Sequence, residues 1–159
     1  MTEIHLRTAA AGDREALVDL IQELNVFEAA ITGDRLVTRG PAEEYLRALD
    51  QRIAQSSGRI VVAVAERRIV GLLAFVIETD QVYVHADVRR YGMVADLVVA
   101  EPWRKRGIGR HLLAEAERLT RDAGLQRLMI GVLAGNDPAL RAYRGFGFRD
   151  YAHILMKPL

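Results

Sequence analysis

The segment LVVAEPWRKRGIGRHLL, residues 97–113, constrains the fold of this chain more than any other. It places an apolar strand, a proline turn, a basic cluster and two glycines directly before an amphipathic helix. Several backbone N–H groups then converge at the positive end of the helix dipole, an arrangement that binds anions. Gly107 and Gly109 would let the main chain approach a phosphate, and the arginines of residues 104–110 would add charge-assisted contacts. The alternative is a solvated basic turn before an ordinary helix.

Hydrophobic periodicity predicts one α/β domain over residues 1–159, with six strands and four helices in a mixed, mostly antiparallel sheet. The expected strands are residues 4–8, 60–65, 69–77, 93–100, 128–133 and 148–156, and the expected helices are residues 13–27, 41–56, 107–123 and 138–143. Residues 79–92 mix turn residues with aromatics and are assigned only to loop and strand extension. The first half is therefore largely antiparallel, and a strand–helix–strand crossover follows it.

Composition excludes several classes of protein. The 22 basic and 21 acidic residues leave a net charge of +1, so no broad positive field attracts nucleic acid. No apolar run approaches the ~20 residues of a membrane helix, and the first residues lack the order of a secretory signal. We therefore expect a cytoplasmic protein that binds neither nucleic acid nor membranes. The absence of cysteine excludes a cysteine nucleophile and disulfides, and the four histidines show no metal-binding spacing.

Two motifs carry a family resemblance. The Walker pattern is absent, and the dinucleotide pattern fails because Leu112 stands where its third glycine should be. In contrast, RKRGIG at 104–109 matches the R/Q-x-x-G-x-G/A loop of the GNAT family, the GCN5-related N-acetyltransferases. Residues 136–148 match the second GNAT pattern, N-x-x-A-x-x-x-Y-x-x-x-G-F. Together with the order of elements, these motifs make nearly the whole chain resemble a GNAT acyl-CoA N-acyltransferase fold.

The resemblance implies acetyl-CoA as cosubstrate, bound between two splayed central strands that match residues 97–99 and 130–133. A main-chain N–H near Val98 or Val99 would polarise the thioester carbonyl, the basic loop would hold the pyrophosphate, and Asn136 would bond to the pantetheine arm. The residues expected to bind acetyl-CoA are Leu97, Val98, Val99, Arg104, Lys105, Arg106, Gly107, Ile108, Gly109, Arg110, Asn136 and Tyr143.

Catalysis requires a proton acceptor and a donor, because alkylamines have a pKa near ~10.4 and the leaving thiol one near ~8.5. The resemblance implies that Tyr143 faces the departing sulfur and donates to it. Several relatives carry a glutamate base at the position matching Ala95, which here is alanine. Asp96 is the neighbouring candidate, although strand alternation directs it to the opposite face of the sheet unless a bulge intervenes. Its rivals, acting through a water relay, are Glu78, Asp80, His85 and Asp87.

These expectations converge on an enzyme that transfers an acetyl group from acetyl-CoA to a primary amine of a small molecule, by direct attack in a ternary complex. The alternatives are a protein or peptide acetyltransferase acting on an N-terminus or a lysine, and a non-catalytic acyl-CoA-binding regulator, which the retained Tyr143 disfavours. Glu28, Glu43 and Glu44 could attract a cationic amine or form a solvated face. Because one final strand would leave a sheet edge exposed, a homodimer is also expected.

Overall fold

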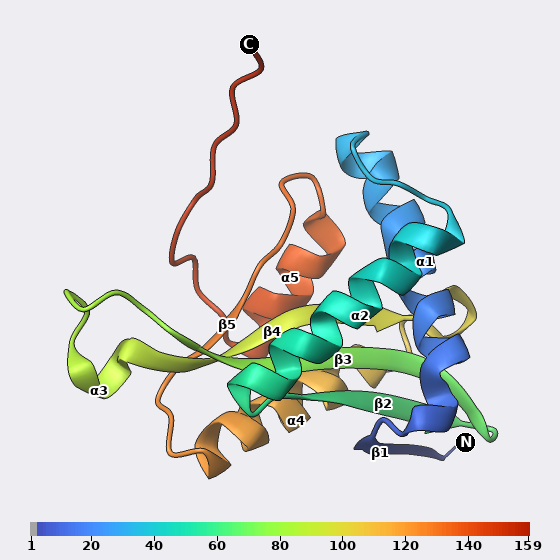
Figure 1. Ribbon diagram of the computed structural model, residues 1–159, viewed down its shortest axis with the longest axis horizontal. Coiled ribbons are helices and arrows are strands. Elements are labelled where there is room, and N and C mark those ends of the chain that lie inside the picture. Colours follow the sequence, from blue (N-terminus) through green and yellow to red (C-terminus); the bar gives the residue numbers. More distant parts are fainter. Residues whose placement is uncertain (1–2) are drawn as a thin grey trace.

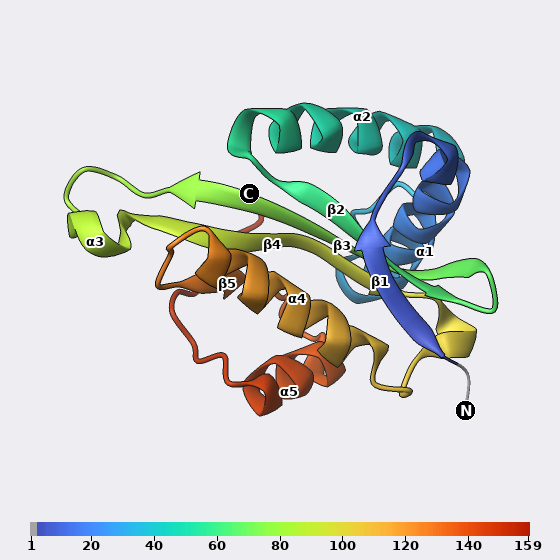
Figure 2. The same cartoon turned by 90° about the horizontal axis from the view of Figure 1, so that it is seen from below.

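The computed structural model describes residues 3–159 and shows a five-stranded sheet with helices on both faces (Figures 1 and 2). The elements are β1 Ile4–Thr8, α1 Arg14–Thr32, α2 Arg39–Ser56, β2 Arg59–Ala65, β3 Arg68–Thr79, α3 Ala86–Arg89, β4 Arg90–Val99, α4 Ile108–Asp122, β5 Leu128–Ile130 and α5 Asp137–Phe146. Short 3-10 turns precede α1 and α4. Among the described helices, none combines the length and apolar composition needed to cross a membrane.

The sheet has the order β1-β2-β3-β4-β5, with antiparallel pairs up to β4 and a parallel β4–β5 pair. Because β2 and β3 are apolar on both faces, each face carries a helical layer. Leu72 belongs to the cluster under α1 and α2, whereas the next residue, Leu73, belongs to the cluster under α4. Side chains of α5 pack on the α4 side. The core is therefore two apolar layers separated by the sheet.

The two central strands separate soon after they pair. β4 pairs with β5 only from Gly92–Leu128 to Val94–Ile130. Beyond this point β5 ends, while β4 continues to Val99 in pairing with β3 alone. The expected splay is confirmed, and it leaves one edge of residues 95–99 without a neighbouring strand.

A β-bulge lies where this separation begins. Ala74 of β3 pairs with Asp96, and Phe75 pairs with Val94, so Ala95 is an extra residue in β4. Ala95 packs on the cluster under α1 and α2, and the side chain of Asp96 reaches α2 as well. The bulge therefore turns two consecutive side chains to the same face.

The sequence prediction is wrong at several elements. The expected strand 148–156 is absent, because the chain leaves the body of the protein after residue 150 and pairs with no strand among the described residues (Figure 1). The strand expected at 128–133 ends at Ile130. Residues 79–92 contain the short helix α3, which makes five helices in the described chain rather than four. The first helix continues beyond Phe27 to Thr32, where Gly33 with φ of 72° provides the stop.

Candidate active site

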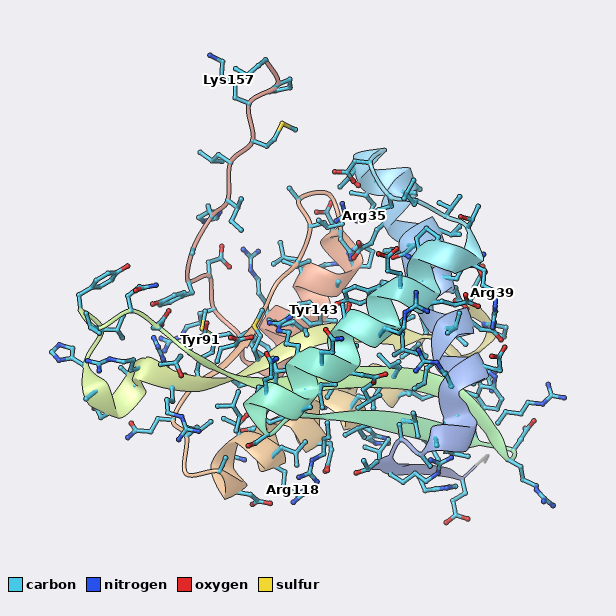
Figure 3. All side chains as sticks on the ribbon, viewed as in Figure 1. Arg35, Arg39, Tyr91, Arg118, Tyr143 and Lys157 are labelled. Atoms are coloured by element: carbon cyan, nitrogen blue, oxygen red, sulfur yellow. The ribbon has the colours of Figure 1, made fainter. Side chains whose placement is uncertain are left out.

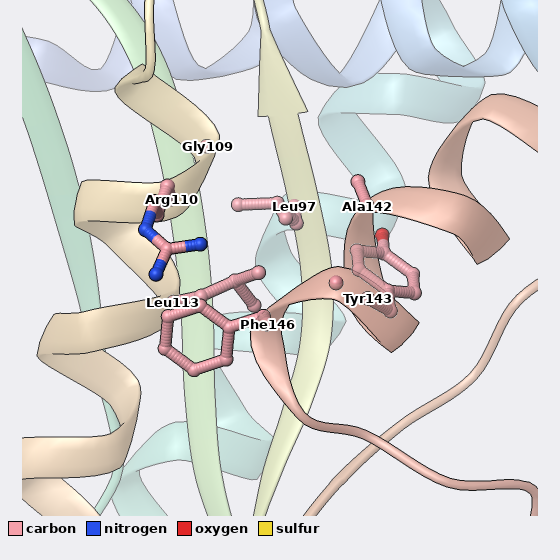
Figure 4. A pocket seen from close by; sticks show the side chains of 8 residues that line it. Leu97, Gly109, Arg110, Leu113, Ala142, Tyr143 and Phe146 are labelled. Atoms are coloured by element: carbon pink, nitrogen blue, oxygen red, sulfur yellow. The ribbon is translucent and has the colours of Figure 1, made fainter.

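A pocket of about 310 Å³ lies between β4, the N-terminal end of α4, and α5 (Figure 4). Its lining residues are Leu97, Gly109, Arg110, Leu113, Ala142, Tyr143, Gly145 and Phe146. Figure 4 shows Leu97 between Arg110 on one side and Tyr143 on the other. The structure thus brings together residues from both sequence motifs, beside the edge that the strand separation exposes.

The N-terminal end of α4 offers free backbone donors to the pocket. Gly107 is its N-cap with φ of 81°, a left-handed conformation that glycine adopts without strain. No side chain caps this end, and the N–H of His111 bonds to the Gly107 carbonyl at 3.1 Å. The N–H groups of residues 108–110 precede this bond and are open to a ligand. A Cβ atom added to Gly109 would meet no atom within 4 Å, so space for an anion lies in front of it.

Two arginines beside this helix end are positioned by aromatic rings. The Arg106 guanidinium lies 4.8 Å from the centre of the Trp103 ring, and that of Arg110 lies 5.5 Å from the centre of the Phe146 ring. Neither forms an ion pair with any carboxylate in residues 3–159. Their positive charge is therefore not neutralised by an ion pair, and their expected contact with a phosphate stays a prediction.

Arg104 has a different environment from the one expected. Its Nε donates to the Val99 carbonyl at 2.9 Å, and its Nη2 donates to Glu23 of α1 at 2.8 Å. The guanidinium also lies 5.4 Å from the centre of the Phe27 ring. Arg104 therefore fastens the basic loop to β4 and α1, and its donors toward a phosphate are largely engaged.

The open edge of β4 presents particular backbone groups. The Ala100 N–H bonds to the Val70 carbonyl at 2.9 Å, which fixes the phase of the antiparallel ladder. Because bonding alternates along a strand, the Val98 N–H points into β3 as well. The N–H groups of Leu97 and Val99 then point to the open edge. Of Val98 and Val99, the two residues whose N–H was expected to polarise the thioester carbonyl, Val98 is the one whose N–H is used inside the sheet.

Asn136 begins the helix that carries Tyr143. Its Oδ1 accepts from the Ala139 N–H at 3.3 Å, and Pro138 occupies the first turn, where a missing N–H has no cost. The expected bond from Asn136 to pantetheine stays a prediction, because its side-chain oxygen caps α5. The cap sets where α5 starts and hence where Tyr143 lies.

The Tyr143 side chain combines a packed ring with an unengaged hydroxyl. The ring meets Phe148 edge-on, with centroids 6.1 Å apart. The hydroxyl forms no hydrogen bond with residues 3–159. Burial, assisted by the negative charge of Glu28, raises the pKa of Tyr143 to about 12. Tyr143 therefore remains a proton-bearing donor throughout the pH range of enzyme assays.

Asp96 forms a hydrogen bond that its sequence neighbourhood does not suggest. The Tyr45 hydroxyl of α2 donates to Asp96 Oδ2 at 2.7 Å. Burial raises the pKa of Asp96, the bond from Tyr45 opposes this shift, and the Glu28 charge adds to it. Burial and the Asp96 charge in turn raise the pKa of Tyr45. The bulge thus places a carboxylate of increased basicity on the side of the sheet covered by α1 and α2.

The C-terminal half of α1 joins these groups into one site. Glu28, paired with Arg35 at 2.8 Å, raises the pKa values of Tyr45, Asp96 and Tyr143. Sequence reasoning considered Glu28 as an acceptor-side acid but did not identify Tyr45, whose helical spacing marks it as core. No sequence signal connects Tyr45 with a residue 51 positions away.

The rival bases occupy less suitable places. Glu78 and Asp80 each form an ion pair with an arginine, at 2.5 and 2.9 Å. His85 and Asp87 are exposed at α3, at the end of the β3–β4 hairpin far from α5 (Figures 1 and 2). Among the five candidates, only Asp96 has a pKa that is raised by the charge of Glu28, as the pKa of Tyr143 is.

Comparison with known proteins agrees with this geometry. The acetyltransferase (GNAT) family pattern matches residues 23–148. A streptothricin acetyltransferase from Streptomyces lavendulae is 32% identical over 158 residues, which cover 89% of this chain and 79% of that protein.

Solved structures show the same fold at low sequence identity. A transcriptional regulator from Bacillus halodurans C-125 superposes with a TM-score of 0.78 at 19% identity, covering 99% of this chain and 100% of that chain. The aminoglycoside N-acetyltransferase AAC(6')-Iy in complex with CoA gives a TM-score of 0.73 at 15% identity, covering 100% and 96%. On the family match and this fold, the chain belongs to the GNAT family of acetyltransferases.

Proposed function

We propose that this acetyltransferase transfers an acetyl group from acetyl-CoA to a primary amine of a cationic small molecule. The observation that carries the proposal is that two groups of residues meet at the open edge of β4. The first is the pocket that contains Tyr143, and the second is the two carboxylates Asp96 and Glu28. A streptothricin acetyltransferase relative and an aminoglycoside acetyltransferase fold neighbour support a small-molecule acceptor.

The donor site follows from the free backbone groups. The pyrophosphate of acetyl-CoA would accept bonds from the N–H groups of residues 108–110, with Arg106 and Arg110 supplying positive charge. The pantetheine arm would lie along the open edge of β4 and bond to the N–H groups of Leu97 and Val99. This placement brings the thioester toward Tyr143 in the neighbouring pocket.

The acceptor site follows from the carboxylates. An alkylammonium near Glu28 and Asp96 is attracted by their negative charge, and the raised pKa of Asp96 makes it a better proton acceptor than an ordinary aspartate. The Tyr45 hydroxyl holds the carboxylate in place. Asp96 therefore takes one proton from the ammonium, which leaves the neutral amine that can attack.

The reaction is then a direct displacement. The amine nitrogen forms a bond to the thioester carbon, and the carbonyl oxygen gains charge that the Leu97 or Val99 N–H stabilises. The carbon–sulfur bond breaks, and CoA leaves as a thiolate to which Tyr143 donates a hydrogen bond. The second proton, which the nitrogen loses as the amide forms, is taken up by the departing thiolate. No acetyl group is carried by the enzyme, in agreement with the absence of cysteine.

An acceptor panel tests this function. Purified protein is incubated with acetyl-CoA and streptothricin, an aminoglycoside, a linear polyamine, a neutral aliphatic alcohol or a lysine-containing peptide, and released CoA is measured with a thiol reagent. The protein contributes no background, since it has no cysteine. We expect CoA release with one or more cationic small molecules and none with the alcohol. Release with the peptide alone would contradict the proposed acceptor class.

A further inference from the structure

The C-terminal half of α1 carries a carboxylate in its apolar stripe. The residues Leu17, Ile21, Leu24, Glu28 and Ile31 follow one another at alternating spacings of four and three positions, so they share one face of the helix. Leu17 and Ile21 are buried, and Leu24 packs on the cluster under α1 and α2. The side chain of Glu28 therefore leaves α1 on the face that covers the sheet, where an unpartnered carboxylate costs free energy.

The surroundings of Glu28 belong to the proposed active site. Three residues further along the same face, Ile31 lies against the segment that precedes α5, since a Cβ atom added to Gly135 would lie 3.1 Å from Ile31 Cγ2. The charge of Glu28 raises the pKa values of three groups on three different elements, namely Tyr45 of α2, Asp96 of β4 and Tyr143 of α5. Glu28 therefore lies within electrostatic reach of both the base and the hydrogen-bond donor of the proposed reaction.

Only one of the two Glu28 oxygens has a partner. Arg35, in the loop after α1, donates from Nε to Glu28 Oε2 at 2.8 Å. Within residues 3–159, Glu28 Oε1 accepts no hydrogen bond, and the side chain is 24% exposed, so a ligand can reach it. Arg35 is also shared, since its Nη1 donates to Asp34 at 2.6 Å. One guanidinium therefore serves two carboxylates, and one Glu28 oxygen remains free.

The charges around Glu28 and the base leave a negative surplus. The charge of Arg52, which also reaches Asp96, is neutralised by Glu78 at 2.5 Å. In the described part of the chain, the Asp96 side chain bonds only to the neutral Tyr45 hydroxyl. Because Arg35 is shared between two carboxylates, one negative charge also remains in its ion-pair cluster. A single ammonium compensates one of these two charges, whereas an acceptor with two cationic groups compensates both.

We propose that Glu28 is a specificity-determining residue of the acceptor site, where it binds a second cationic group of the acceptor while the reacting amine lies at Asp96. Since this role rests on the proposed acetyl transfer, it narrows the acceptors to molecules with two cationic groups, of which only one is acetylated. The free Oε1 of Glu28 accepts a hydrogen bond from an ammonium or guanidinium of the acceptor, and Arg35 holds the carboxylate by its other oxygen.

The chemistry of the reaction gives the second cation its purpose. The reacting nitrogen gives up its positive charge before it attacks, so its electrostatic attraction to the enzyme is lost at that point. A second cation takes no part in bond formation and keeps its charge throughout. Its contact with Glu28 therefore stabilises the bound acceptor and the transition state equally, which lowers KM for a dication relative to a monocation and leaves kcat similar.

Matched pairs of amines test this contact. CoA release is measured with linear diamines and with the linear monoamine of each chain length, in the unaltered protein, Glu28→Gln and Glu43→Gln. At the best chain length, kcat/KM for the diamine should exceed that for its monoamine at least about tenfold, the effect of one charge-assisted hydrogen bond, and mainly through KM. Glu28→Gln should lower this ratio to within about threefold. Taking the ratio within one variant cancels any effect of the substitution on Asp96. If the linear amines are not acetylated, the same ratio is taken from their inhibition of the streptothricin or aminoglycoside reaction.

Glu43→Gln is the matched control, because Glu43 also accepts from an arginine Nε, that of Arg39 at 3.1 Å, and Figure 3 shows Arg39 well away from Tyr143. This variant should keep the full preference for diamines. If Glu28 serves only its ion pair with Arg35, Glu28→Gln should instead lower Tm and leave the ratio unchanged.

The outcomes separate this inference from the function on which it rests. Equal efficiency of diamine and monoamine in the unaltered protein, or a diamine preference that persists in Glu28→Gln, would overturn the role of Glu28 and leave acetyl transfer intact. Absence of CoA release with every amine, streptothricin and the aminoglycoside included, would refute the proposed function and this inference with it.

Discussion

Replacing Tyr143 by phenylalanine separates a catalytic hydroxyl from a structural ring. The hydroxyl has no hydrogen-bond partner in residues 3–159, and the edge-on contact with Phe148 at 6.1 Å involves only the rings. Phenylalanine therefore keeps the packing and removes one unpaired polar atom. The free energy of unfolding should change by no more than about 0.5 kcal/mol, the usual range for a substitution that disturbs no contact.

The expected loss of rate follows from the acidity of the two groups. Tyr143 has a pKa of about 12, whereas a thiol has one near ~8.5, so full proton transfer to the thiolate is uphill by roughly 5 kcal/mol. The hydroxyl therefore donates a hydrogen bond as charge grows on sulfur. Such a hydrogen bond is at the low end of general acid effects. Removing it should lower the turnover rate about 10²-fold, which raises the activation free energy by about 2.7 kcal/mol. Both kcat and kcat/KM should fall together.

The assay measures CoA release and thermal unfolding on one preparation, with Tyr91→Phe as the matched control. Tyr91 lies on β4 near the departing C-terminal segment, away from the pocket (Figure 3), so the loss of its hydroxyl should leave kcat unchanged. The pH profile of Tyr143→Phe should be lower but of the same shape from about pH 6 to about pH 10, because a donor with a pKa of about 12 does not titrate there. Unchanged kcat in Tyr143→Phe, or a reduced Tm with normal turnover, would refute the donor role.

Three further variants test the remaining parts of the site. Asp96→Asn keeps an acceptor for Tyr45 but removes the base, so kcat should fall about 10²- to 10³-fold. Because the pKa of Asp96 is raised by folding, its contribution favours the folded state at low pH and is lost as pH rises through the raised pKa. The variant should therefore have an equal or higher Tm at neutral pH, and a lower Tm with normal kcat would contradict the assignment. Gly109→Glu places a negative side chain in open space, so the protein should fold. Calorimetry should show CoA binding at least tenfold weaker, and an unchanged affinity would show that the phosphate does not bind at this helix end. Arg104→Ala should lower Tm, while Arg106→Ala should weaken CoA binding at constant Tm, and the reverse pattern would show that the two roles were exchanged.

Features of this protein that depend on local interactions could be predicted from its sequence. The glycines at 107 and 109, the cap at Asn136 and the apolar repeats of the helices act within a few residues, so the pattern alone predicted the helix end, the position of Tyr143 and the family. The splay between the central strands also followed, because it belongs to the family resemblance. These features depend on backbone propensity and spacing, which a sequence states directly.

Tertiary structure decided which of these residues are available for chemistry. The bulge that turns Asp96 toward α2 depends on its register with β3, and register is set by long-range pairing. The same register directs the Val98 N–H into the sheet. Tyr45 and Glu23 engage Asp96 and Arg104 from distant helices, which no local pattern encodes.

The strand expected at 148–156 shows the same limit. Its residues have the composition of a strand, but a strand forms only where its backbone groups pair with those of a neighbouring strand, and residues 148–156 do not pair with the outer edge of β5. Which backbone groups pair is decided by the path of the folded chain and not by local composition.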